Sequence, residues 1–228
     1  MTERPADIFQ HIPVDFHFPE FARRIRMEHT GQSRKDIDAV LGRALPLLNP
    51  KAVYKVSYIG ERNQDRITLD NVDFRSKALS DNLQQVQRVF PYVATCGHEV
   101  DELVVDAADF LAQFWIDTLK VMALESALRF LEKHIKAKHH IEQLSSMNPG
   151  SGEQDFWPIE QQKNLFALFG DVQALIHVRL TDSCLMIPNK SVSGLYFATD
   201  AKFETCQFCS RDNCPRRRAP YNESHPQF

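Results

Sequence analysis

Hydrophobic residues fall into stretches of helical and of strand spacing along the first half of the chain. Apolar side chains three or four residues apart predict a helix over residues 34–47 and a short helix over 77–83. Runs of β-branched and aromatic residues that stop at a glycine predict strands over 52–59 and 86–95. Helices and strands therefore alternate in this half.

The segment from residue 99 to 141 contains neither proline nor glycine and keeps a helical row of apolar side chains. This spacing predicts the main core helix, or two consecutive ones. A single helix of this length would be on the order of 60 Å long at about 1.5 Å per residue, which exceeds a domain of this size. We therefore expect a bend or a break within it.

The second half of the chain again mixes element types. Residues 145–155 carry proline and glycine and are expected to form a loop, and a helix is expected to open at Pro158 and run to Gly170. Residues 172–180 and 191–197 alternate like strands. The pattern as a whole predicts an α+β fold with one long core helix and an irregular cysteine-rich C-terminal tail.

Composition narrows the class of protein. The chain has 228 residues, 43% of them hydrophobic and 25% charged, which fits one compact globular domain or two small ones. A net charge of −3 and a pI near 6.3 favour neither nucleic acid nor an anionic membrane as a partner. The N-terminal segment lacks the apolar core of a signal peptide, and the cysteine count of five is odd, so we expect a cytoplasmic protein without structural disulfides.

The segment Leu180–Phe197 follows the pattern L-T-x-S-x-x-M-x-P-x-x-S-V-S-G-x-Y-F. This spaced pattern resembles the signature of the reactivation domain of cobalamin-dependent methionine synthase. Pro149-Gly150 and the helix that opens at Pro158 occur in the same order as in that family. The resemblance covers roughly residues 100–205, and it implies a twisted antiparallel sheet flanked by helices.

The resemblance also implies a function. The family's domain binds S-adenosylmethionine over a corrinoid whose cobalt has been oxidised; after one electron arrives, the cob(I) form takes the sulfonium methyl group. Here the domain would be free-standing and span residues 1–204, with 30–98 the least certain part, followed by a tail over 205–228. The chain has no D-x-H-x-x-G motif for a cobalt ligand, so a corrinoid-binding methyltransferase would supply the cobalamin, and a further protein would donate the electron.

Six residues are candidates for S-adenosylmethionine binding because they match family positions. Glu125, on the long helix, matches a ligand glutamate, and its carboxylate would border apolar surface and accept from an ammonium or a ribose hydroxyl. The family loop R-P-A-P-G-Y corresponds to Ser146–Ser151, where the arginine and the tyrosine are both replaced. A serine cannot pair with the ligand carboxylate as an arginine does. The remaining candidates are Pro149, Gly150, Ser151, Lys202 and Phe203, the last standing where the family has a tyrosine.

The C-terminal tail adds a second candidate site. Cys206, Cys209 and Cys214 have C-x2-C-x4-C spacing, which favours metal ligation over free thiols. Zinc with a fourth, distant ligand and an iron–sulfur cluster fit the spacing about equally. Arginines surround these cysteines and would offset the charge of a thiolate site or meet an acidic partner.

Two hypotheses about function follow. The first is an accessory protein that reactivates a corrinoid-dependent methyltransferase with S-adenosylmethionine as methyl donor. The alternative is a metal-binding or iron–sulfur electron-transfer or interaction module that has kept the fold and lost S-adenosylmethionine binding, because the loop arginine and tyrosine are gone.

Overall fold

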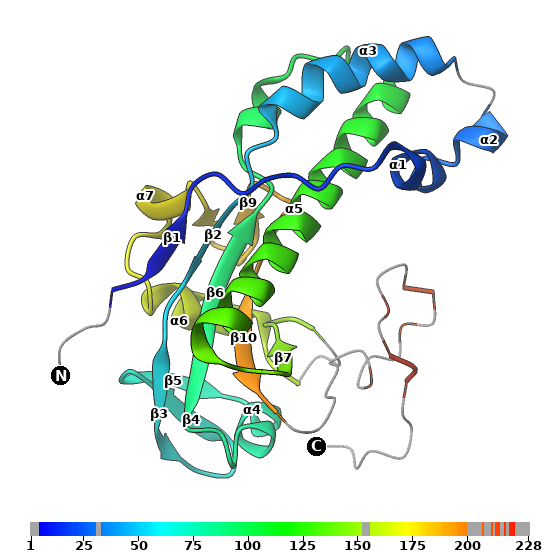
Figure 1. Ribbon diagram of the computed structural model, residues 1–228. Helices are drawn as coiled ribbons and strands as arrows, with labels where there is room; N and C mark the ends of the chain where they lie inside the picture. The colour runs from blue at the N-terminus through cyan, green and yellow to red at the C-terminus, as the bar shows by residue number, and fades with distance from the viewer. Residues whose placement is uncertain are drawn as a thin grey trace.

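The computed structural model describes residues 5–30, 33–151, 156–199, 207, 211, 213–214, 217 and 219–221. Within these residues the chain forms a mostly antiparallel sheet with helices on both faces and one long helix (Figure 1). The predicted α+β class is therefore confirmed. The division of the chain at residue 204 stays a prediction.

The central strand of the sheet is β6 (Arg88–Thr95), which has antiparallel neighbours on both sides. On one side it pairs with β10 (Ser191–Ala198), which in turn pairs with β7 (Leu144–Met147). On the other side it pairs with β2 (Lys51–Tyr54), and β1 (Asp7–Phe9) pairs with β2. The strands predicted over 86–95 and 191–197 are confirmed as β6 and β10.

The predicted strand over 52–59 is wrong in its continuity. It is divided into β2 and β3 (Ser57–Arg62), both of which pair with β6. The interruption lies where Lys55 donates its backbone N–H to the carbonyl of Pro91. Pro91 has no N–H to return, so the ladder is broken at this point.

A hairpin that the sequence analysis did not predict extends the sheet. Strands β4 (Arg66–Leu69) and β5 (Val72–Arg75) pair with each other, and β4 pairs with β3. Asp70 and Asn71 turn the chain with φ of 46° and 69°. Asp and Asn tolerate this left-handed conformation better than other non-glycine residues, so they suit a two-residue turn.

Helices cover the front face of the sheet in Figure 1. The long helix α5 (Phe110–His139) crosses this face, and its buried residues join the largest core cluster together with residues from β2, β6 and β10. The helix α3 (Arg34–Ala44) packs on α5 and continues as the 3-10 helix η1 (Leu45–Leu47). The helix predicted over 34–47 is thus confirmed. The short helices α1 (Phe18–Arg24) and α2 (Met27–Thr30) precede it.

The expected break in the long helical segment is confirmed. Glu99–Glu102 forms a separate 3-10 helix, η2, and α5 begins only at Phe110. Asp109 fixes this start because its side chain accepts a hydrogen bond from the backbone N–H of Ala112 at 2.9 Å. A carboxylate at this position satisfies an otherwise unpaired donor of the first helical turn.

On the opposite face a second core contains residues of α4 (Lys77–Asn82) and α6 (Gln162–Ala167), and the 3-10 helix η3 (Ile159–Gln161) directly precedes α6. Trp157, which is fully buried, lies at the centre of this core and contacts Phe74 edge to face. The helices predicted over 77–83 and from Pro158 are confirmed, the latter beginning as a 3-10 turn.

The strand predicted over 172–180 is wrong. Residues Val172–Ile176 form a short helix, α7, and only Arg179–Leu180 is a strand, β8, which pairs with β9 (Met186–Ile187). Asp171 caps the helix by accepting from the N–H of Ala174 at 3.0 Å. The apolar residues Val172 and Ile176 lie four apart and are both buried, so one helical face makes the contacts.

Candidate functional site

Glu125 lies in the middle of α5 and is held by an arginine from α1. Its Oε2 accepts a hydrogen bond from Arg24 Nη2 at 2.8 Å, and the same nitrogen donates to Glu20 Oε1 at 2.5 Å. The side chains of Arg24 and Glu125 are each 27% exposed. Thr118 and Met122, which share this side of the helix, are buried, so the carboxylate borders apolar surface as expected.

The charges of this cluster do not cancel. One guanidinium lies between two carboxylates, which leaves a net charge of −1 on Glu20, Arg24 and Glu125. The hydrogen bond to Glu125 raises the pKa of Arg24 above its ordinary value, and this effect outweighs the opposing effect of partial burial. The guanidinium therefore stays protonated, and the group attracts a further cation.

Local sequence explains why α1 presents Arg24 to α5. Pro19 lies in the first turn of α1, where its missing N–H costs nothing. Phe21 and Ile25 are 0% and 2% exposed and join the main core. Ser126 Oγ of α5 also accepts from the backbone N–H of Asp15, just before α1. These contacts fix the register of α1 against α5.

The loop that corresponds to the family motif was expected over Ser146–Ser151. It begins two residues later, at Asn148, because strand β7 (Leu144–Met147) includes the first two of these residues. Asn148 then turns its side chain over the sheet. Its Nδ2 donates to Tyr92 Oη and to the Ser193 carbonyl, both at 2.8 Å. A Cβ at Gly194 would collide with Asn148 Nδ2 and with the Met147 carbonyl, so the signature glycine allows this close approach.

Pro149, Gly150 and Ser151 form a tight turn that packs away from α5. The N–H of Gly150 donates to the Trp157 carbonyl at 2.8 Å, and the N–H of Ser151 donates to the Asn148 carbonyl at 3.1 Å. The nearest side chain to Gly150 is that of Ile159. The turn is thus anchored to the segment that leads into α6.

The structure places the predicted ligand residues in two groups. Glu125 belongs to the α1–α5 contact, whereas Pro149, Gly150 and Ser151 belong to the turn after β7. Among the described residues, no hydrogen bond or ion pair joins these groups. Lys202 and Phe203 lie outside the described residues.

The signature segment folds as the β8–β9 hairpin followed by β10. Thr181 Oγ1 accepts from the N–H of Leu185 at 3.0 Å, which closes the hairpin turn. Ser191 Oγ donates to the Pro188 carbonyl at 2.7 Å and is hydrogen-bonded to Thr95 Oγ1 at 2.9 Å. The hydroxyl groups of the signature therefore satisfy local backbone and side-chain partners, and β10 inserts between β6 and β7.

The cysteine site stays a prediction. Cys206 and Cys209 lie outside the described residues, and Cys214 is half-buried. Within the described ranges, no group of three or more His, Cys, Asp or Glu side chains is arranged to hold a metal ion. Cys96 is buried, and this burial raises the pKa of its thiol to about 12, so it stays protonated. The metal-binding alternative thus gains no support from the described part of the chain.

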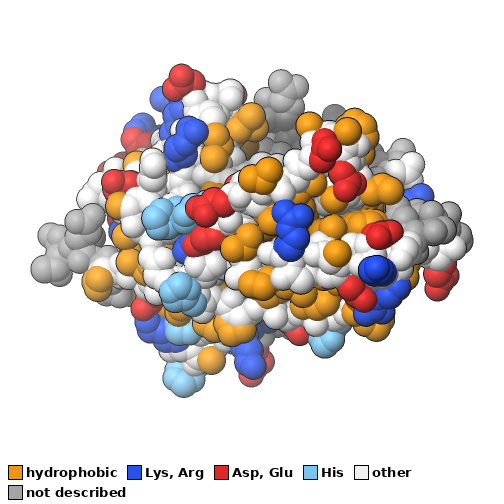
Figure 2. Space-filling model, turned by 90° about the horizontal axis from the view of Figure 1, so that it is seen from above, with side chains coloured by type: hydrophobic (Ala, Val, Ile, Leu, Met, Phe, Trp, Pro, Cys, Tyr) orange, Lys and Arg blue, Asp and Glu red, His pale blue; other side chains and the backbone are white. Residues whose placement is uncertain are grey.

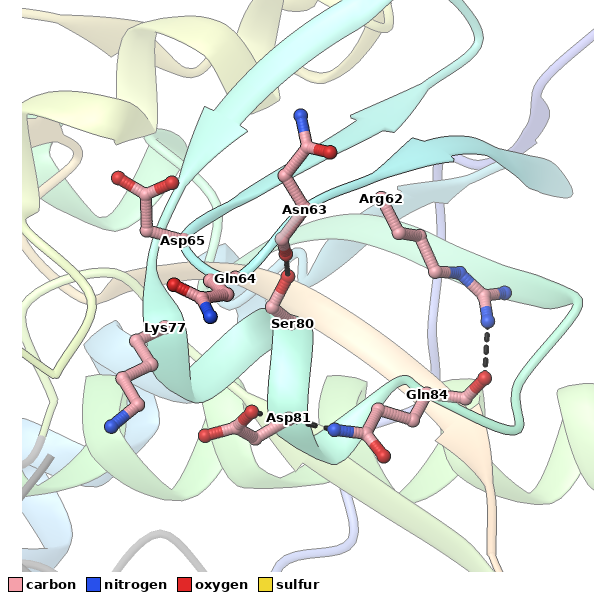
Figure 3. A pocket seen from close by; sticks show the side chains of 8 residues that line it. All are labelled: Arg62, Asn63, Gln64, Asp65, Lys77, Ser80, Asp81 and Gln84. Carbon is pink, nitrogen blue, oxygen red and sulfur yellow. Dashed lines mark hydrogen bonds between the residues drawn. The ribbon is translucent and has the colours of Figure 1, made fainter.

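A cavity of about 930 Å³ lies apart from these groups, between the β3–β4 connection and α4 (Figure 3). Arg62 in its wall donates to the backbone carbonyls of Gln84 and Val86, and Ser80 Oγ donates to the Asn63 carbonyl. These polar groups thus bind the protein's own backbone, and the cavity contains none of the predicted ligand residues. On the face seen from above, cationic, acidic and hydrophobic side chains are interspersed (Figure 2). Among the described residues, no helix is both long enough and apolar enough to span a bilayer.

Comparison with known proteins defines the class. Residues 132–218 match the family described as vitamin B12 dependent methionine synthase, activation domain. The fold is similar to that in a crystal structure of the MetH reactivation domain bound to AdoHcy, with a TM-score of 0.55 and 19% sequence identity over 83% of this chain and 69% of that chain. No curated protein sequence matches the chain. The resemblance predicted from the sequence is therefore confirmed: this chain resembles the methionine synthase reactivation domain in its C-terminal sequence and in its fold.

Proposed function

We propose that the protein reactivates a corrinoid-dependent methyltransferase such as methionine synthase and binds S-adenosylmethionine as the methyl donor. The observation that carries the proposal is the match of residues 132–218, which include the whole signature, to the activation-domain family. The AdoHcy bound to the similarly folded MetH domain supports an S-adenosyl ligand.

Residues of both groups have suitable chemistry for this ligand. Glu125 is a partly buried carboxylate that can accept from an ammonium or from a ribose hydroxyl. The turn of Pro149, Gly150 and Ser151 follows β7, which pairs with β10, and the N–H groups of Gly150 and Ser151 hold the turn in place by bonding within the protein. Lys202 and Phe203 follow the signature in the sequence and are proposed as further ligand residues.

The corrinoid is proposed to be held by a corrinoid-binding partner or domain outside residues 1–228, since these residues lack the D-x-H-x-x-G motif of a cobalt ligand. When bound to that partner, the corrinoid supplies the nucleophile that takes the methyl group, and a separate protein would provide the electron. This chain's own contribution is to hold the methyl donor in position and keep its orientation fixed, which lowers the entropic barrier when two reactants must meet. We also propose a cytoplasmic location, from the match to the activation-domain family.

Calorimetric titration with S-adenosylmethionine tests the ligand. We expect saturable binding by the unaltered protein and weaker binding by the Glu125→Gln variant, because the amide loses the charge that attracts an ammonium. Glu132→Gln is the matched control on the same helix, where Glu132 pairs with Lys136 at 2.7 Å. It should bind like the unaltered protein.

A second assay tests reactivation itself. A cobalamin-loaded fragment of methionine synthase that lacks its own activation domain is oxidised to the inactive cob(II) state and mixed with this protein, S-adenosylmethionine and a reductant. Recovery of methyl transfer only when this protein is present would support the proposal. Binding of neither S-adenosylmethionine nor the corrinoid fragment would contradict it.

A further inference from the structure

Glu125, the carboxylate residue expected to bind the ligand, pairs with an arginine that lies far from it in the sequence. Position 146, where the resembling family has the loop arginine, is a serine. Arg24 instead reaches Glu125 from α1, at a separation of 101 residues along the chain. The arginine beside Glu125 therefore comes from helix α1 and not from the loop at residues 146–151.

Arg24 retains hydrogen-bonding capacity. Both of its bonds to the glutamates use Nη2, and among the described residues no hydrogen bond reaches its Nη1 or Nε. A guanidinium has five N–H donors in one plane, and the two glutamates use the two that Nη2 carries. The Nε and Nη1 donors of Arg24 are thus available for single, charge-assisted hydrogen bonds to a further acceptor.

The same cluster also suits a positive group. The net charge of −1 on Glu20, Arg24 and Glu125 attracts an ammonium, while the remaining Nε and Nη1 donors of Arg24 attract a carboxylate. An α-amino acid carries both groups one carbon atom apart. The exposed fractions of these side chains, 27% for Arg24 and Glu125 and 35% for Glu20, leave the cluster open to a ligand.

The packing of α1 on α5 has its own source. Phe21 and Ile25 bury their side chains in the main core, whereas an ion pair with this much exposure contributes about 0–1 kcal/mol to stability. The fold of α1 therefore does not explain why an arginine stands at position 24.

We propose that Arg24 binds the carboxylate of the ligand's amino-acid group while Glu125 accepts from its ammonium. The inference rests on the proposed function, and it names the end of the S-adenosyl ligand that the α1–α5 contact recognises. Arg24 is then the specificity-determining residue that takes the place of the missing loop arginine.

Calorimetry with two matched thioethers tests this assignment. S-adenosylhomocysteine carries the amino-acid group, and 5′-methylthioadenosine lacks it. In the unaltered protein S-adenosylhomocysteine should bind more tightly. Arg24→Gln should weaken S-adenosylhomocysteine roughly tenfold to a hundredfold, the range for a charge-assisted hydrogen bond, and leave 5′-methylthioadenosine unchanged. Arg24→Lys should fall between, because it keeps the charge and loses the fixed directions of the Nε and Nη1 donors.

Arg23→Gln is the matched control, since Arg23 is the exposed neighbour in the same helical turn. It should alter neither affinity. The inference is overturned, while the proposed function stands, if Arg24→Gln loses the same affinity for both thioethers or keeps its full affinity for S-adenosylhomocysteine. Failure of the unaltered protein to bind either thioether or S-adenosylmethionine overturns the proposed function and the inference together.

Discussion

Glu99 and Glu125 offer a comparison between two glutamates in similar settings. Each is 27% exposed and each forms an ion pair with one lysine or arginine, and His98 Nδ1 also lies 3.5 Å from Glu99 Oε2. The partners differ: Lys51, which pairs with Glu99, is 3% exposed, whereas Arg24 is 27% exposed. Asn49 also donates to Glu99, at 2.7 Å. The burial of the cation, not that of the glutamate, distinguishes the two sites.

This difference separates a structural pair from an accessible one. A buried ammonium depends on its partner, because it cannot turn to water when the partner is removed. A partly exposed guanidinium can exchange one partner for another at little cost. The comparison predicts that changes at the Glu99 site reduce stability, whereas changes at the Glu125 site alter binding.

The largest expected effect is that of Lys51→Met. The variant leaves Glu99 without its ion-pair partner and should lower the free energy of unfolding by about 3 kcal/mol, at the low end for buried pairs because Glu99 is partly exposed. Urea unfolding followed by circular dichroism measures the change. If Lys51→Met lowered the free energy of unfolding by less than Arg24→Gln does, the distinction between the two sites would be wrong.

Gly97→Ala should have the next largest effect. Gly97 has a φ of +91°, and an added Cβ would lie 2.7 Å from Glu99 Oε2 and would also collide with the Asn49 carbonyl. Backbone strain of this kind costs about 1–3 kcal/mol. The melting temperature should fall accordingly, while Gly42→Ala, where a Cβ meets open space on α3, should not reduce it.

The pH dependence of stability should come next. Burial opposes ionisation of Glu99, but hydrogen bonds from Lys51 and Asn49 and from the backbone hold its pKa at about 2, below the ordinary 4.5. The unfolded chain therefore takes up this proton first as the pH falls. The contribution of Glu99 is complete above pH 4.5 and is lost toward pH 2.

Urea midpoints at neutral and acidic pH measure this contribution. The stability gap between the unaltered protein and Glu99→Gln should shrink as the pH falls from 4.5 toward 2. The exposed Glu102→Gln variant serves as the control. A gap that stays constant across this range would show that the charge of Glu99 is not what stabilises the fold.

Arg24→Gln and Glu125→Gln should have the smallest effect on stability. Glu125→Gln removes one partly exposed ion pair and Arg24→Gln removes two, and each variant should change the free energy of unfolding by about 1 kcal/mol or less. The same two variants are those for which ligand binding should weaken most. A large loss of stability in either would remove the contrast with Lys51→Met.

Several elements of the fold could be predicted from local sequence alone. The helix over 34–47, the central strand over 86–95 and the break before α5 follow from periodicity and from length. The hairpin at Asp70-Asn71 was not predicted, although two turn-forming residues between short apolar runs are the relevant signal. The alternation of residues 172–180 predicts a strand, whereas Asp171, a residue type that favours the helix N-cap, is the local signal for the helix that forms there.

The candidate site was predictable only in part. The signature over Leu180–Phe197 predicted the resemblance to the activation-domain family, because its residues are close together in the sequence. Arg24 has no signal in the local sequence, since tertiary contacts, the packing of Phe21 and Ile25 and the bond from Asp15 N–H to Ser126 Oγ, bring α1 to α5. Pro19 within the first turn marks the start of helix α1 and was the one local signal available for that helix.

The central position of β6 limits how this protein can be divided. The family-matched region, residues 132–218, contains β7 and β10 but not β6, with which β10 pairs over Ser191–Tyr196. An excised fragment of that region would expose an unpaired strand edge and half of its apolar core. The recognisable signature is therefore not an autonomous folding module, and a recombination event that transplants it must carry β6 and its neighbours as well.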